Sequence, residues 1–275
     1  MNSRYKGIFF ITLSALSFAF MNAFVRLSGD LPSVQKSFFR NLVAFFIALI
    51  MIIRSKDGFK IEKGNLKYMI LRATFGTVGI LCNFYAVDHL VLSDASMLNK
   101  MSPFFVIIFS FLLLKEKMSP AQALAVAGAF IGSLFVIKPT FTNMALVPSL
   151  IGLCGGICAG IAYAMVRILG QRDQKGSSVV IFFSGFSCVD FHPMSGLQIL
   201  TLLGAGLAAA GGQFGITAAY YHAPAKEISI YDYSQIIFST ILGFFLFGQV
   251  PDRYSVLGYV IICAMALWMF VYNKN

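Results

Sequence analysis

The sequence predicts an all-α membrane protein with ten transmembrane helices, arranged as two inverted repeats of five helices each. Three observations support this prediction: the composition, the number of long apolar segments, and a duplication within the chain. Of the 275 residues, 58% are hydrophobic and only 12% are charged, whereas soluble domains carry about 25% charged residues. A soluble fold of this length could not bury so many apolar side chains, so we expect lipid to surround them.

Apolar segments follow one another along the chain, and a spanning helix needs about 20 mostly apolar residues. We expect ten spans, at residues 7–27, 34–53, 68–87, 95–114, 121–137, 146–169, 177–189, 199–221, 228–247 and 254–272. The first is longer than the apolar part of a signal peptide, which is about 7–15 residues, so we expect it to be retained. The seventh is unusually short: its 13 residues would reach only about 20 Å across a core of about 30 Å.

The distribution of Lys and Arg indicates the orientation. If the N-terminus is cytoplasmic, the even-numbered loops and both tails hold 13 of the 21 basic residues, and the opposite side holds three, Lys36, Lys138 and Arg253. Basic residues accumulate on the cytoplasmic side of membrane proteins. We therefore expect a multi-pass protein of the cell inner (plasma) membrane with both termini cytoplasmic. Its net charge of +10 then requires no nucleic-acid partner.

The chain contains an internal duplication. Residues 86–120 align without a gap to residues 219–253 at an offset of 133, and residues 22–29 align to 163–170 at an offset of 141. Each copy holds five spans, and an odd number inserts the second copy upside down, as in many secondary transporters. We expect a first repeat at residues 5–140 and a second, inverted repeat at 146–273.

The two offsets differ by eight residues, so the second copy is shorter across the interval that holds the seventh span. Two explanations stay open. Either the second copy has lost two helical turns, or residues are missing from the sequence.

Each half ends in a helix, a turn and a further helix, at residues 103–137 and 236–270. The first copy carries an acidic turn, "LLKEKMSPAQ", with Glu116 and the following Pro120. With ten spans in two halves, the chain resembles the drug/metabolite transporter superfamily and is identified as an EamA-type ten-helix permease. It departs from that pattern at Gln249, which replaces the acid, and in its short seventh span. The resemblance implies transport of small metabolites, often amino acids, related polar compounds or drugs, without ATP.

Polar and ionisable side chains inside spans are costly, so each is a candidate for function. Lys100 could reach the lipid headgroups through its flexible stem or face a central cavity. Asn99 and Pro103 favour the cavity, because a proline frees a backbone carbonyl and loosens the helix. Arg40 and Arg72 could attract an anionic group or reach lipid phosphates. The predicted substrate-binding residues are Asn22, Asn83, Asn99, Lys100, Tyr163, Gln213, Tyr231, Asp232, Tyr233 and Gln235.

Lys100 and Asp232 are expected to lie apart. Inversion would place Lys100 near the outer end of its helix and Asp232 near the inner end, some 15 Å apart along the membrane normal. We therefore predict opposite lips of one path, one cationic and one anionic, suited to a zwitterion. Asp232 is also a candidate for a coupling proton, since burial favours the protonated carboxyl; alternatively it is a hydrated acid at a helix end.

For several other residues we predict structural roles. Arg26 and Arg167 end equivalent helices and are expected to anchor them, and Asp94 and Glu227 lie at helix starts, where the dipole favours acids. Glycines at four-residue spacing predict close helix packing: Gly128 and Gly132; Gly152, Gly156 and Gly160; Gly211 and Gly215. The five cysteines lie in apolar segments and are expected to be packing residues.

The predicted function is a secondary active transporter that moves small polar or zwitterionic metabolites, such as amino acids, by alternating access. The alternatives are an exporter of drug-like cations and a passive channel or scaffold. An enzyme is not expected, because no HExxH or GxSxG motif occurs in a suitable context and the three histidines are dispersed. We expect no cofactor and no metal site. The expected partners are a small-molecule substrate, the lipid bilayer and a coupling proton; monomer and dimer both stay open.

Overall fold

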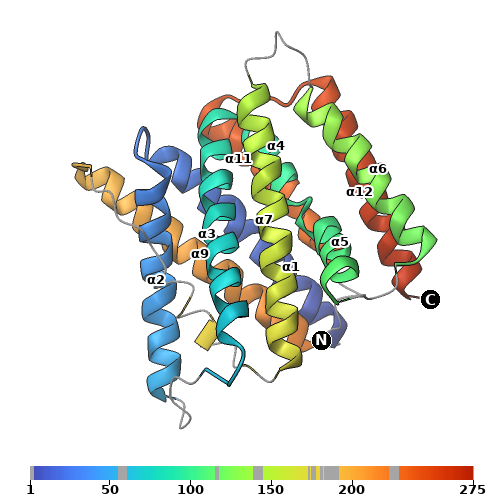
Figure 1. Cartoon of the computed structure of the whole chain (residues 1–275). Helices are drawn as coiled ribbons and strands as arrows, with labels where there is room; N and C mark the ends of the chain where they lie inside the picture. Colours follow the sequence, from blue (N-terminus) through green and yellow to red (C-terminus); the bar gives the residue numbers. More distant parts are fainter. Residues whose placement is uncertain are drawn as a thin grey trace.

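The computed structural model is a bundle of helices (Figure 1). It describes residues 3–54, 61–114, 118–138, 145–172, 174, 178–179, 182, 192–222 and 229–274. The helices are α1 (Ser3–Leu27), α2 (Ser33–Arg54), α3 (Leu66–His89), α4 (Leu92–Asn99), α5 (Ser102–Leu114), α6 (Pro120–Ile137), α7 (Leu146–Gln171), α9 (Gly196–His222), the 3₁₀ helix η1 (Ser229–Tyr233), α11 (Ser234–Phe247) and α12 (Arg253–Lys274). The all-helical prediction is confirmed for these residues.

Eight helical segments of the described chain are long and apolar enough to cross a membrane. Eight of the ten expected spans correspond to them. The expected span at 95–114 does not form one helix: it begins earlier, at Leu92, and is divided into α4 and α5. The expected short span at 177–189 lies outside the described residues, apart from Ser178, Val179 and Phe182.

Both termini lie at the same end of the bundle (Figure 1). We call this the termini end, and the opposite end the far end. α1 runs from the termini end to the far end, whereas α7 and α12 run from the far end back towards the termini end. The turns that join α1 to α2, α3 to α4 and α11 to α12 therefore lie at the far end.

Local sequence explains where several helices begin. Ser119 caps α6: its hydroxyl accepts from the Gln122 N–H, the Gln122 side chain accepts from the Ser119 N–H, and Pro120 occupies the first helical position. Such a capping box satisfies two donors that the first turn leaves open. Asp252 caps α12 with a single bond, because its carboxylate accepts from the Ser255 N–H at 2.8 Å.

Glycines allow three helix pairs to pack closely: α6 with α12, α7 with α4, and α9 with α1. A Cβ at Gly132 would lie 2.7 Å from Ile262, one at Gly156 would lie 2.6 Å from the Leu98 carbonyl oxygen, and one at Gly215 would lie 2.9 Å from Ser14. The predicted role of these glycines in helix packing is confirmed. Their contacts lie within one chain.

Candidate substrate cavity

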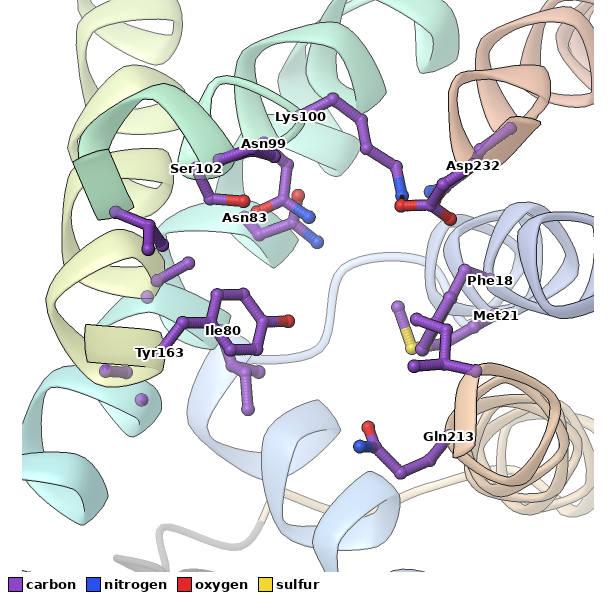
Figure 2. A pocket seen from close by; sticks show the side chains of 18 of the residues that line it. Phe18, Met21, Ile80, Asn83, Asn99, Lys100, Ser102, Tyr163, Gln213 and Asp232 are labelled. Carbon is purple, nitrogen blue, oxygen red and sulfur yellow. Dashed lines mark hydrogen bonds and ion pairs between the residues drawn. The ribbon is translucent and has the colours of Figure 1, made fainter. Parts of the chain in front are cut away.

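A cavity of about 420 Å³ lies in the middle of the bundle (Figure 2). Its walls come from both halves of the chain: α1, α2, α3, α4 and α5 from the first, and α7, α9, η1 and α11 from the second. Nine of the predicted site residues line it: Arg40, Arg72, Asn83, Asn99, Lys100, Tyr163, Gln213, Asp232 and Gln235. Side chains that lie far apart in the sequence therefore share one polar space.

The opposite walls carry polar side chains that face one another. Tyr163 extends from α7 into the cavity, and Gln213 extends from α9 on the other side (Figure 2). Asn99 of α4 and Asn83 of α3 also line the cavity (Figure 2). Amide and hydroxyl groups both donate and accept hydrogen bonds, so the cavity can hold a polar molecule.

The break between α4 and α5 is built by the sequence around Pro103. Proline has no N–H, so the α-helical bond to the carbonyl four residues earlier cannot form. α4 ends at Asn99, and α5 begins at Ser102 with Pro103 in its first turn. The predicted loosening of the helix is confirmed by this break. The carbonyl of Lys100 lies within the break and accepts a hydrogen bond from the Tyr233 hydroxyl of η1 at 3.3 Å.

Lys100 and Asp232 form an ion pair across the cavity (Figure 2). The prediction that the two side chains lie some 15 Å apart is therefore wrong. Lys100 is only 8% exposed and lines the cavity, so its amine does not extend to the lipid headgroups.

The error has a geometric reason. α4 begins at Leu92, so Lys100 lies eight residues into the membrane helix, about 12 Å from its end. α4 and α11 pack side by side and run in opposite directions. Their contacts are Leu92 N–H to Gln249 Oε1 at 2.9 Å, Ser96 to Ser239 hydroxyls at 2.8 Å, and then Lys100 to Asp232. The break between α4 and α5 therefore lies beside η1 at the start of α11, and the long side chains of Lys100 and Asp232 bridge the remaining distance.

A chain of buried polar groups lies beside this ion pair. The Asn83 amide donates to Asn22 Oδ1 at 3.4 Å, the Asn22 amide donates to the Ser96 hydroxyl at 3.3 Å, and Ser96 bonds Ser239. Asn22 is fully buried and lies outside the lining, and its bond to Asn83 connects it to a residue that lines the cavity. These bonds connect α3, α1, α4 and α11 in the bundle interior, where an unpaired polar group would be costly.

Two further predicted residues lie at the edge of the site. Tyr233 does not line the cavity but holds the Lys100 carbonyl. Tyr231 is 38% exposed and also lies outside the lining. Gln235, by contrast, lines the cavity and is 2% exposed.

Arg40 and Arg72 both line the cavity. Nη1 of Arg40 donates to Asn41 Oδ1 at 2.9 Å. Both arginines thus lie at the cavity, and a role in attracting an anionic group stays a prediction.

Sequence reasoning missed two buried pairs at the far end. Lys36 was counted among the basic residues outside the spans, but its side chain is fully buried and both oxygens of Asp88 lie 2.7 Å from its amine. Asp94 is at a helix start as predicted, and it also accepts a hydrogen bond from Tyr259. Lys36 lies in the first turn of α2 and Asp88 in the last turn of α3. Opposite charges at the facing ends of consecutive helices were the sequence signal that could have predicted this pair.

Arg26 does more than end α1. It donates to the carbonyl oxygens of Val87, at 2.9 Å, and Leu90, and its guanidinium lies 5.1 Å from the centre of the Phe247 ring. Arg26 thus connects α1 to the α3–α4 turn and to the end of α11. The expectation for this residue was that it anchors the end of its helix. The side chain of Arg167, and both Glu116 and Glu227, lie outside the described residues.

Within the described parts of the chain, no group of three or more His, Cys, Asp or Glu side chains could hold a metal ion. Four of the cysteines, Cys82, Cys154, Cys158 and Cys263, are free. Cys188 lies outside the described residues.

Comparisons with known proteins support the resemblance drawn from the sequence. Residues 5–138 match the EamA-like transporter family. The pseudopaline exporter CntI of Pseudomonas aeruginosa is 29% identical over 94% of this chain and 93% of its own length. Human solute carrier family 35 member G1 is 29% identical over 94% of this chain and 77% of its length.

A riboflavin transporter of Brucella anthropi is 27% identical over 87% of this chain and 88% of its length. A solved crystal structure with 14% identity superposes with a TM-score of 0.60 over 98% of this chain and 99% of that chain, which shows a shared fold. The resemblance to EamA-type permeases is confirmed, and the named relatives are transporters. Two of the names give different solutes, pseudopaline and riboflavin, so the names assign no substrate here.

Proposed function

We propose that this chain, an EamA-type permease, is a secondary active transporter that moves small polar or zwitterionic metabolites across the cytoplasmic membrane by alternating access. The observation that carries the proposal is the polar cavity between α1–α5 and the second half of the bundle, with the Lys100–Asp232 ion pair in its wall. Its volume of about 420 Å³ lies within the range of small-molecule sites, roughly 300–1,000 Å³.

The two halves are proposed to be inverted repeats, at residues 5–140 and 146–273. The contacts between α4 and α11 support this. Two helices related by a two-fold axis in the membrane plane run antiparallel and cross where equivalent residues meet. The pairs Ser96–Ser239 and Lys100–Asp232 lie close to the point where residues 133 apart would face each other, which is the offset of the duplication.

The contacts at the two ends of the bundle support alternating access. At the far end, Arg26 ties α1 to the α3–α4 turn and to Phe247 of α11. At the termini end, the described polar contacts near the ends of α3 and α7 join these two helices, as between Tyr68 and Arg172. We infer that movement of one half against the other requires the contact between Arg26 and Phe247 to open, because α1 and α11 belong to different halves.

The protein is proposed to lie in the cell inner membrane. The proposed orientation places the termini end on the cytoplasmic side. The sequence assigns three basic residues to the far side, and two of them have acidic partners: Lys36 with Asp88, and Lys138 with Asp252. The far side therefore presents even less net positive charge than the count of basic residues suggests, which agrees with the positive-inside rule.

The Lys100–Asp232 pair supports a zwitterionic substrate. A bound amine would interact with the Asp232 carboxylate and a bound carboxylate with the Lys100 ammonium, so a zwitterion could replace each partner of the pair. In the state without a bound substrate, release of Lys100 would leave Asp232 free to take up a proton. This would couple transport to the pH gradient without any further ionisable group.

The proposal is tested with the full chain in proteoliposomes that carry a pH gradient, using labelled amino acids as probes. We expect uptake above the external concentration, which collapses when an ionophore removes the gradient. Equilibration without concentration would instead support a passive channel. Absence of any protein-dependent flux for amino acids and for related polar and cationic solutes would contradict the proposed function.

A further inference from the structure

Three uncharged polar side chains of the cavity lining, those of Asn99, Ser102 and Gln235, have no hydrogen-bond partner among the described residues. Ser102 is 8% exposed and Gln235 is 2% exposed, so the protein encloses both. Asn83 also lines the cavity, and its Oδ1 atom is buried without a partner. A polar group removed from water without a hydrogen bond is costly. The lining therefore holds donors and acceptors that the described protein leaves unsatisfied.

The three side chains lie next to the ion pair between Lys100 and Asp232. Asn99 directly precedes Lys100, and Ser102 follows it at the break between α4 and α5. Gln235 is three residues after Asp232, in the first turn of α11. Because the ion pair joins these two segments, the uncharged polar groups and the two charges belong to one part of the cavity.

The contact between the Ser96 and Ser239 hydroxyls, at 2.8 Å, places two of the amides at the same level of the bundle. Asn99 is three residues after Ser96, and Gln235 is four residues before Ser239, which is about one helical turn in each case. α4 and α11 pack against each other and run in opposite directions. Both turns therefore lead from the serine contact towards the ion pair, one from each half of the chain.

The chemistry of these groups indicates what they can bind. An amide presents two N–H donors and an accepting oxygen, and a hydroxyl both donates and accepts. A hydroxyl or carboxamide of a solute could satisfy them. An apolar group of the same size would displace water and leave them unpaired, which is why sites built to hydrogen-bond a solute strongly reject analogues that lack the matching group.

We propose that Asn99, Ser102 and Gln235 determine which solutes are transported, by binding an uncharged group that both donates and accepts hydrogen bonds, beside the charges held by Lys100 and Asp232. This rests on the proposed function and deepens it. Net charge alone does not then select a zwitterion: its side chain must carry a hydroxyl or a carboxamide.

The test uses the full chain in proteoliposomes with a pH gradient and three pairs of labelled amino acids: threonine and valine, asparagine and leucine, glutamine and methionine. The members of a pair have the same net charge and nearly the same size, and only the first carries the uncharged polar group. The variants are Asn99→Leu, Ser102→Ala and Gln235→Met. Thr240→Val is the matched control, because Thr240 lies on α11 outside the lining and bonds the Ile236 carbonyl of its own helix at 2.8 Å.

We expect the unmodified protein to take up the polar member of at least one pair roughly tenfold or more faster than its apolar partner. In Asn99→Leu and Gln235→Met this ratio should fall towards one, and in Ser102→Ala it should fall by a smaller factor. Thr240→Val should keep the ratio. A variant that merely loses folded protein lowers both fluxes together, so the ratio separates selection of the solute from a structural role.

Equal uptake within every pair, or faster uptake of the apolar members, would overturn this inference and leave the transporter proposal intact. An unchanged ratio in both Asn99→Leu and Gln235→Met would overturn it as well. If none of the six amino acids enters while another solute does, the inference also fails and the transporter stands. Absence of protein-dependent flux for every solute counts against the transporter itself.

Discussion

Two ion pairs in this protein have the same chemistry and different surroundings. In the cavity, Lys100 and Asp232 have side-chain exposures of 10% and 21%; at the far end, Lys138 and Asp252 have 28% and 51%. Breaking a buried pair by removing one partner leaves an uncompensated charge in a poorly solvated place, whereas water and salt replace most of what an exposed pair provides. The comparison teaches that location determines what each lysine contributes.

The largest expected effect is that of Lys100→Met. It removes the cation that faces Asp232 and any acidic group of a bound solute, so transport should fall by at least about 100-fold while the protein is still produced in the membrane. Flux into proteoliposomes measures this. Lys138→Met is the matched control and should transport normally. Normal transport by Lys100→Met would show that the cavity residue assignment is wrong.

Asp232→Asn is expected to have the next largest effect. The amide keeps the shape of the side chain but cannot exchange a proton, so solute should still equilibrate while concentration by a pH gradient is lost. The ratio of uptake with and without the gradient measures the coupling. A variant that still concentrates solute with the gradient would exclude Asp232 as the coupling group.

Lys36→Met tests a pair between these extremes. Lys36 is fully buried, and its partner Asp88 is 20% exposed. The free energy of unfolding should fall by roughly 3 kcal/mol, because Asp88 would be left without its cation. Thermal unfolding in detergent measures the loss, and Lys36→Arg should restore most of it. Equal stability of Lys36→Met and the unmodified protein would mean that the pair contributes nothing.

The smallest effect is expected for Lys138→Met, with a loss below about 1 kcal/mol. Burial alone would raise the pKa of Asp252, but the hydrogen bonds from Lys138 and the Ser255 N–H lower it overall. A lowered pKa stabilises the fold above the unfolded value, about 3.9, and this contribution is lost as the pH falls through the folded-state pKa. Unfolding of both proteins from pH 7 to 3 should therefore show the small difference disappearing in acid.

Much of the architecture could be predicted from local sequence. Runs of apolar residues identified α1, α2, α3, α6 and α12 closely, because the cost of unpaired backbone groups in lipid forces any such run into a helix. A single proline, Pro103, likewise indicated that the helix is loosened at that point. Arg40 and Arg72 could be recognised as candidates by the cost of charge inside a span, but sequence alone left open whether they face lipid or solute.

The sequence by itself determined that this is a membrane bundle with polar groups in its interior, since hydrophobicity and proline geometry act over a few residues. Only the tertiary structure decided which of those groups meet. Lys100 and Asp232 are 132 residues apart in the sequence. Their contact depends on where α4 and α11 cross and on how many residues of each helix precede the crossing. The crossing point is set by the packing of helices across the bundle. A prediction made for each span separately contains no information on that packing.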